Sequence, residues 1–216
     1  MSSVALLDEF RKLKSGNHIC LLYESEYEWQ EAVSAFLISG LEKNEKCICM
    51  IKNHTPEQIW QYLQARGVDI NNDDIKKQLL IININSWSEL KNSLNPKTIT
   101  TLLGREFLQA RSEGYASFRF TGEIGWMLGH SPYNLDRILD YVGVLNRDLF
   151  PNFRCIAMFR CFNKRYSNRT IKNIVMAHPI YIRNNKIYYN THYRLPRNLL
   201  ENLEKERQEQ LYFLQN

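Results

Sequence analysis

The chain has 216 residues, a length typical of one α/β domain with short appendages. Its apolar fraction of 44% and charged fraction of 24% are ordinary for a globular protein, and no run of about 18 apolar residues is present to span a membrane. The net charge of +5 comes from basic residues scattered among acidic ones, which argues against direct nucleic-acid binding. The first residues lack the layout of a secretory signal, so we expect a cytoplasmic protein.

The first half of the chain alternates between helical and strand-like patterns. An amphipathic helix is predicted at Val4–Lys14, then a strand at His18–Tyr23, a helix from about Glu28 to Leu41, and a strand at Lys46–Ile51. Thr55-Pro56-Glu57-Gln58 has the residues of a capping box, which predicts a helix that ends at Gly67. Leu79–Ile84 is apolar throughout, which predicts a third strand buried on both faces.

The second half continues the same alternation. Helices are predicted at 96–113, 134–149 and 167–177, and strands at Ala116–Thr121 and Cys155–Cys161. Asn184-Asn185 separates two short strand-like runs, as in a tight hairpin, and a charged helix is predicted over 197–214. Strands that alternate with helices five times predict an α/β three-layer sandwich with a mainly parallel sheet and a hairpin at one edge.

The loop after the first strand reads Tyr23-Glu-Ser-Glu-Tyr-Glu28. In an open parallel sheet this loop lies at the carboxyl edge, where ligands usually bind. Glu24, Glu26 and Glu28 would repel a triphosphate, and neither G-x-x-x-x-G-K-[ST] nor G-x-G-x-x-G occurs. No G-x-S-x-G elbow of a serine hydrolase is present either. The sequence therefore predicts neither nucleotide hydrolysis nor a cofactor.

The five cysteines are odd in number and lie mostly in predicted strands, which argues against a disulfide framework. His18 and Cys20 share one face of the first strand, and Cys47 and Cys49 share one face of the second. If those strands were neighbours, the four side chains could converge on zinc. The favoured alternative is that the cysteines are small apolar residues of buried strands. A thiol-based redox switch is a third interpretation.

Polar residues near the ends of predicted strands form the candidate ligand site. Such groups collect at the carboxyl ends of parallel strands, where they can anchor a small molecule. The predicted ligand-binding residues are His18, Tyr23, Glu24, Arg119, Glu123, Trp126 and His178. The alternatives are an internal Arg119–Glu123 ion pair, core positions for Trp126 and Tyr23, and histidines that only donate structural hydrogen bonds.

Short motifs follow one another in order over residues 15–196. They are His18-Ile-Cys-Leu-Leu-Tyr23, Glu45-Lys-Cys-Ile-Cys49, Thr55-Pro-Glu57, Arg119-Phe-Thr-Gly-Glu-Ile-Gly-Trp126, Leu145-Asn146, His178-Pro179 and Asn190-Thr-His-Tyr-Arg-Leu-Pro196. This series resembles the MEDS domains, methanogen/methylotroph sensory domains named after a dichloromethane-responsive regulator. The family positions that match are His18, Tyr23, Glu45, Arg119, Glu123, Trp126, Asn146 and His178.

The resemblance implies a RecA/KaiC-like core without a phosphate-binding loop. It also implies sensing of small organic molecules, such as hydrocarbon derivatives, with output through a histidine kinase or a DNA-binding partner. The chain departs from the family pattern at Tyr141-Val-Gly-Val144 and at Phe159-Arg160-Cys161, where acidic residues are usual. The loss of two acids near the sheet edge implies a changed ligand preference or the loss of sensing.

We therefore expect three parts: an amphipathic helix over 1–14, a sensory domain over 15–196, and a signalling or dimerisation helix over 197–216. The main hypothesis is a non-catalytic domain that binds a small organic ligand at the carboxyl edge and needs no metal. One alternative is an interaction module that assembles, for example as a homodimer, through its terminal helices. The other is a degenerate ATPase-like protein.

Overall fold

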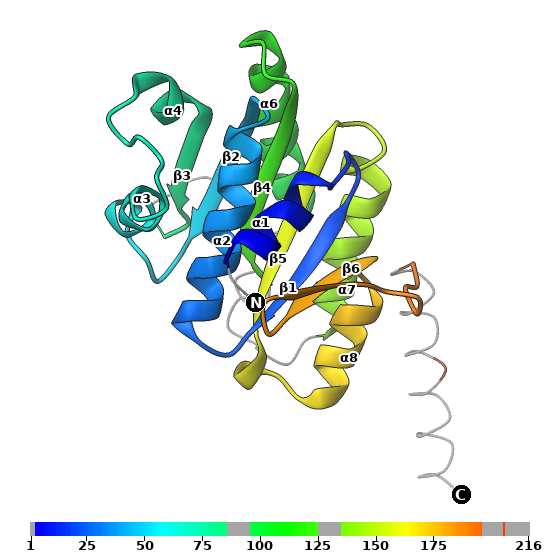
Figure 1. Cartoon of the computed structure of the whole chain (residues 1–216). Coiled ribbons are helices and arrows are strands. Elements are labelled where there is room, and N and C mark those ends of the chain that lie inside the picture. The colour runs from blue at the N-terminus through cyan, green and yellow to red at the C-terminus, as the bar shows by residue number, and fades with distance from the viewer. Residues whose placement is uncertain (1–2, 86–95, 125–134, 196–204, 206–216) are drawn as a thin grey trace, which may run out of the picture.

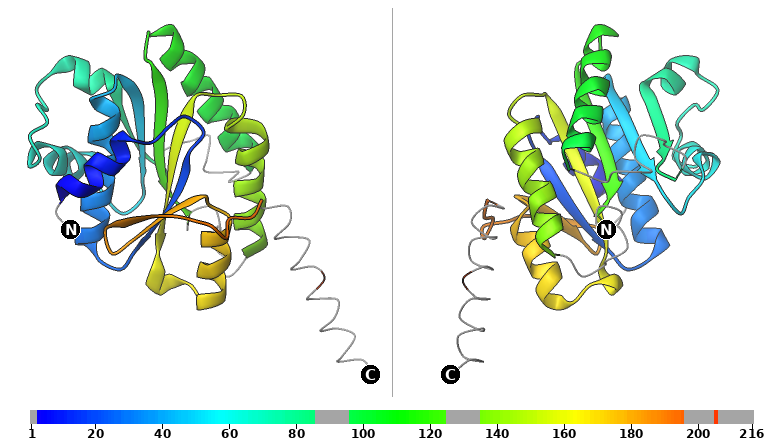
Figure 2. Two further views of the ribbon diagram at one scale, coloured as in Figure 1. Left: turned by 45° about the vertical axis from the view of Figure 1, so that its right-hand side comes forward. Right: turned by 180° about the vertical axis from the view of Figure 1, so that it is seen from behind.

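The fold is built around a seven-stranded sheet with the strand order β3-β2-β4-β5-β1-β6-β7. The structure is a computed structural model that describes residues 3–85, 96–124, 135–195 and 205. All neighbouring strands are parallel except β6 and β7, which form an antiparallel hairpin. Figures 1 and 2 show helices on both faces of this sheet, so the predicted three-layer sandwich with an edge hairpin is confirmed.

The elements follow one another along the chain as the sequence predicts. The strands are β1 His18–Tyr23, β2 Glu45–Ile51, β3 Leu79–Asn83, β4 Ser117–Glu123, β5 Cys155–Phe162, β6 Ile180–Arg183 and β7 Lys186–Tyr189. The helices are α1 Ser3–Arg11, α2 Glu26–Leu41, α3 Pro56–Gln64, α4 Asp73–Gln78, α6 Pro96–Ser112, α7 Leu135–Val144 and α8 Asn168–Met176. A π-helical turn, Leu145–Leu149, extends α7, and a 3₁₀ turn, Asn163–Arg165, follows β5.

The central strands are buried on both faces, and successive side chains enter two separate cores. In β1, Ile19 and Leu21 pack with α1 and α2, whereas Cys20 and Leu22 belong to the core on the other face. This period of two follows from the pleat of a strand. The face occupied by α1 and α2 is called the α2 face below, and the opposite face, with α6, α7 and α8, is called the α8 face (Figure 1).

Local signals in the sequence set several boundaries. Thr55 and Gln58 form the predicted capping box of α3. The turn between β6 and β7 has positive φ values of 50° and 55° at Asn184 and Asn185, as a two-residue hairpin of this kind requires. These residues tolerate that conformation because their short polar side chains stabilise left-handed backbone.

Two predictions about strands are wrong. β3 is an edge strand paired only with β2, and most of its residues are partly exposed rather than buried on both faces. A continuous apolar run therefore does not distinguish an edge strand from a central one. β4 continues to Glu123, so Arg119 lies within the strand instead of leaving it.

Gly40 in α2 gives the helix room to approach the sheet. A Cβ at this position would lie 2.6 Å from Cys47 Sγ and 2.9 Å from Arg119 Cδ. We expect Gly40→Ala to lower the free energy of unfolding by about 1–3 kcal/mol, because overpacking outweighs the helix propensity of alanine. Gly104→Ala in α6 is the control, since its Cβ would lie 3.4 Å from Phe153 Cζ and should be neutral or stabilising. Equal effects of the two changes in urea denaturation would contradict this account.

None of the described helices is long and apolar enough to cross a membrane. The predicted helix over 197–216 lies outside the described residues apart from Lys205, and the proposed division of the chain at residues 14 and 196 stays a prediction. α1 packs on the core, as an amphipathic helix is expected to do, because Leu6 and Phe10 are buried against α2-face residues.

Candidate functional site

A charged cluster lies at the carboxyl edge of the sheet, on the α2 face. Tyr23 ends β1, Glu123 ends β4, and Arg160 lies opposite Glu123 in the register of β4 and β5. The Tyr23 hydroxyl donates to Glu123 Oε1 over 2.8 Å, and Arg160 Nε lies 3.8 Å from Glu123 Oε2. The Glu123 side chain remains 21% exposed, so a ligand could reach this carboxylate from solvent. We refer to Tyr23, Glu123 and Arg160 as the edge cluster.

Arg160 is buried and carries more hydrogen-bond donors than the fold uses. Its Nη2 donates to the backbone oxygen of Met50, and its guanidinium lies over the Trp29 ring, 5.1 Å from the centroid. Within the described part of the chain, its Nε and Nη1 have no hydrogen-bond partner. A buried cation with unused donors is costly unless a nearby anion compensates it, and Glu123 is that anion.

Burial raises the pKa of Glu123 above its usual range, while the Arg160 charge and the Tyr23 hydrogen bond act in the opposite direction. The carboxyl group of Glu123 therefore loses its proton at a higher pH than that of an exposed glutamate. Burial also raises the pKa of Tyr23, so its hydroxyl stays protonated and can donate. The cluster thus offers both donors and acceptors at one edge.

The loop between β1 and α2 is closed by its own carboxylates. Glu28 Oε2 accepts from the Glu24 backbone N–H over 2.7 Å, and Ser25 Oγ caps the helix by accepting from the Glu28 N–H. Glu24 also accepts from Asn163, and Glu26 accepts from His54 over 2.9 Å. A phosphate cradle needs backbone N–H groups that point outward at a helix N-terminus. Here two of those donors are used internally and the loop is negative.

Arg119 does not belong to the edge cluster. It is fully buried in the middle of β4, four residues or about 13 Å along the strand from Glu123. Its Nε donates to Glu45 Oε2 over 2.6 Å, and its Nη1 donates to Ser39 Oγ and to the backbone oxygen of Phe36. The expected position at the sheet edge and the alternative Arg119–Glu123 ion pair are both wrong. The partner of Arg119 is Glu45.

The two histidines also lie away from the carboxyl edge. His18 begins β1, and His178 precedes β6, so both lie at the amino edge of the sheet. Their rings are 5.5 Å apart, and His18 is stacked on Phe150. Burial lowers the pKa of His18 to about 3 and that of His178 to about 4, so both are neutral at pH 7. The expectation that they join Tyr23 at one edge is wrong.

Two predicted ligand-binding residues remain, Glu24 and Trp126. Glu24 lies beside the edge cluster in the exposed loop, where Asn163 Nδ2 donates to its Oε1 over 2.7 Å. Trp126 lies outside the described residues. The structure therefore brings together Tyr23, Glu24 and Glu123, and a ligand-binding role for these residues stays a prediction.

The zinc hypothesis fails on strand order. β1 and β2 are separated by β5 and β4, so the His18–Cys20 pair cannot meet the Cys47–Cys49 pair. Among the described residues, no group of three metal-ligating side chains comes together. All five cysteines are free and buried, and burial raises the pKa of Cys47 and of Cys155 to about 12. Thiolates are therefore scarce at neutral pH, which disfavours a redox switch.

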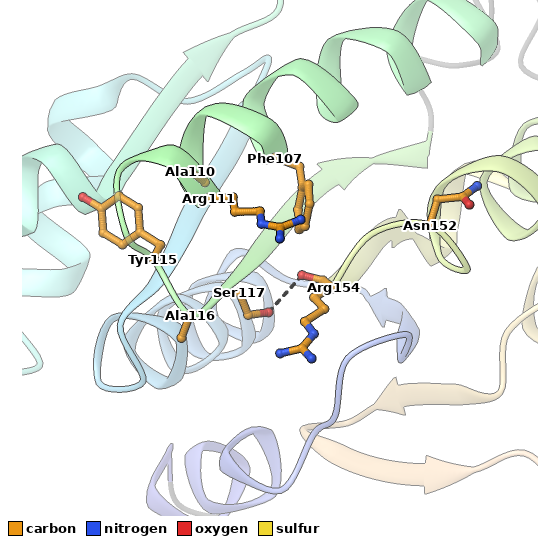
Figure 3. Close-up of a pocket in the computed structure, with 8 residues that line it drawn as sticks. All are labelled: Phe107, Ala110, Arg111, Tyr115, Ala116, Ser117, Asn152 and Arg154. Carbon is orange, nitrogen blue, oxygen red and sulfur yellow. Dashed lines mark hydrogen bonds between the residues drawn. The ribbon is translucent and has the colours of Figure 1, made fainter.

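Two cavities lie elsewhere on the molecule. One, of about 490 Å³, opens at the amino edge between the end of α6 and the beginnings of β4 and β5. Figure 3 shows Arg111 beside Phe107 in this cavity, and Ser117 donating to the backbone oxygen of Arg154. The other, of about 690 Å³, lies between α8 and the β6–β7 hairpin. Neither cavity is predictable from the sequence pattern.

Sequence reasoning missed Arg160, Trp29 and His54 as members of the site region. The Trp29 ring is stacked on His54 with centroids 3.9 Å apart, and Arg160 lies over the same indole. A signal for Arg160 was present, because a charged residue inside an otherwise apolar strand needs a partner. Trp29 gives no such signal, because a tryptophan on the inner face of a helix is usual in a core.

Comparisons with known proteins agree with this architecture. A KaiC-like protein from the hyperthermophilic archaeon Pyrococcus horikoshii OT3 is similar in fold, with a TM-score of 0.53 and 12% sequence identity over 77% of this chain and 70% of that chain. No curated protein is significantly similar to the chain in sequence. The family model for the MEDS domain, the methanogen/methylotroph DcmR sensory domain, matches residues 17–179. A KaiC-like core and a match over more than half of the chain lead to one conclusion: this chain belongs to the MEDS family of sensory domains.

Proposed function

We propose that this chain is a non-catalytic sensory domain that binds a small uncharged or cationic organic molecule at the carboxyl edge of its sheet. The observation that carries this proposal is the partly exposed carboxylate of Glu123, held by Tyr23 and Arg160 beside a loop with no phosphate cradle. Membership of a sensory family supports the sensing role. The negative charges at the carboxyl edge support an uncharged or cationic ligand rather than an anion.

Glu123 keeps capacity to accept a hydrogen bond from a ligand. Its Oε1 is used by Tyr23, but its Oε2 lies 3.8 Å from Arg160 Nε, beyond hydrogen-bond distance. A hydroxyl, amide or ammonium group of a ligand would therefore find an acceptor there. Glu24 in the neighbouring loop, with Glu26 and Glu28 in the first turn of α2, adds negative charge beside it, which disfavours anions.

The same features argue against a degenerate ATPase. The KaiC-like neighbour shares the fold at 12% identity, which carries no catalytic residue over to this chain. ATP would have to place its phosphates against three glutamates whose loop already satisfies two of its own N–H donors. Turnover of ATP with magnesium that is lost in Glu123→Gln would revive the enzymatic alternative.

We further propose that binding is passed to a histidine kinase or to a DNA-binding output partner. The route is the chain after residue 189, which leaves β7 and returns to α8. The terminal segment 197–216 would then act as a signalling or dimerisation helix. If the protein is instead an assembly module, removal of residues 197–216 would abolish a dimer in light scattering while no small molecule stabilises the chain.

A screen of uncharged and cationic organic compounds, with nucleotides included, tests the proposed ligand site by thermal shift. Compounds that stabilise the chain should bind Glu123→Gln at least tenfold more weakly in isothermal titration, because a carboxylate acceptor worth about 1.5–3 kcal/mol is lost. Tyr23→Phe should weaken binding less. Glu9→Gln, in an exposed ion pair on α1, is the matched control and should bind normally. Unchanged binding to Glu123→Gln would refute this site.

A further inference from the structure

The cavity between α8 and the β6–β7 hairpin has an apolar interior. Leu22 of β1 and Tyr181 of β6 line it from the sheet, and Ile171, Val175 and Met176 line it from α8. Leu22 faces away from Leu21, which packs on the α2 face, so this cavity lies on the α8 face of the sheet. It is therefore separated from the edge cluster by the sheet itself. Its volume of about 690 Å³ is within the range of small-molecule sites.

The charged residues that line this cavity are all cations. They are Lys172, Arg183 and Arg194, and none of the described residues that line the cavity is a carboxylate. Lys172, Arg183 and Arg194 are exposed, and none of the three has an ion pair within the described part of the chain. Unpaired cations around an apolar interior favour a ligand with an anionic group at one end and an apolar chain or ring at the other.

We infer that the cavity between α8 and the β6–β7 hairpin binds a small amphiphilic organic anion, an alkyl or aryl carboxylate. The apolar walls take the hydrocarbon body, and the arginines at the rim take the carboxylate, for which guanidinium geometry is well suited. This inference goes beyond the proposed function, because it concerns the other face of the sheet and the opposite charge preference. The edge cluster and this cavity can therefore be tested independently of each other.

The cavity joins α8 to the segment that leads toward the end of the chain. Asn190 Nδ2 donates to the backbone oxygens of Val175 and His178 over 2.9 and 3.0 Å, and the Arg194 N–H donates to Met176 over 2.8 Å. Asn190, His192 and Arg194 also line the cavity. A bound carboxylate would contact both sides of this junction and so stabilise the attachment of residues 190–194 to α8.

Titration of the full chain with octanoate, below its micelle-forming concentration, tests the inference by calorimetry. Octanoate should bind. Acetate should bind at least tenfold more weakly because it lacks the hydrocarbon chain, and octylammonium should bind at least tenfold more weakly because its charge is reversed. Combined Arg183→Gln and Arg194→Gln should weaken octanoate binding at least tenfold. Lys186→Gln removes an exposed cation of the same hairpin that does not line the cavity, and should have no effect.

A second variant tests the apolar interior. Val175→Phe should fill part of the cavity and abolish octanoate binding, with circular dichroism as the check on folding. Equal binding of octanoate and octylammonium, or octanoate binding that survives the two arginine changes, would overturn the inference. Glu123→Gln should leave octanoate binding intact, so failure at this cavity is distinguishable from failure of the edge site.

Discussion

Glu45→Gln is expected to lower the free energy of unfolding by about 3–5 kcal/mol, because it leaves the Arg119 charge buried without its partner. Both side chains are buried, and Arg119 Nε lies 2.6 Å from Glu45 Oε2. Arg119→Met should cost a similar amount, since it leaves the carboxylate unpaired. A domain of this size has about 5–15 kcal/mol of stability in total, so either variant should be partly unfolded at 37 °C.

The combined change Glu45→Leu with Arg119→Met should be more stable than either single variant. A buried ion pair replaced by apolar side chains is often neutral or stabilising, and here Arg119 Nη2 has no hydrogen-bond partner within the described residues. Urea denaturation of the single and double variants measures this coupling. Additive losses would contradict the assignment of the pair. Glu9→Gln, which breaks an exposed pair with Lys12, should cost less than about 1 kcal/mol.

Lowering the pH from 7 to 5 is expected to reduce the free energy of unfolding by about 4 kcal/mol through His18 and His178 together. Burial lowers the pKa of His18 to about 3 and that of His178 to about 4 in the folded chain, against 6.5 when unfolded. Between these values the unfolded chain binds protons that the folded chain does not, so stability falls as the pH falls below about 6.5. Each histidine contributes about 2 kcal/mol over this interval.

Denaturation of the wild-type chain and of the His18→Gln, His178→Gln double variant at both pH values measures this contribution. The double variant should lose about 4 kcal/mol less than the wild type over the same interval. Glu123 acts with the opposite sign, because its raised pKa favours the folded chain at low pH, but it is common to both proteins and cancels in the comparison. Equal losses in wild type and double variant would contradict the account.

The order of elements was predictable because it depends on local signals. The apolar run of His18–Tyr23, the capping box at Thr55 and the asparagine turn of the hairpin each act over a few residues, and all three are confirmed. Strand order is different, because it is set by long crossovers that carry no local signature. For this reason the sequence did not separate the edge strand β3 from the central strands.

The candidate site was predictable only in part, for the same reason. Tyr23 and Glu123 end parallel strands and so meet at one edge, as the general rule for such sheets predicts. Arg119 was misplaced because β4 continues four residues beyond it, and its partner Glu45 lies on a strand whose neighbours the sequence did not reveal. In the sequence Arg160 stands out only as a departure from the family pattern, although in the structure it compensates the charge of Glu123.

A crystal structure of the chain with the most stabilising uncharged compound from the screen tests the central claim most directly. The account predicts electron density for that compound at the ends of β1 and β4, with a donor group within hydrogen-bond distance of Glu123. A nucleotide that binds instead with its phosphates against residues 23–28 would contradict the account. So would a compound whose contacts include neither Tyr23 nor Glu123.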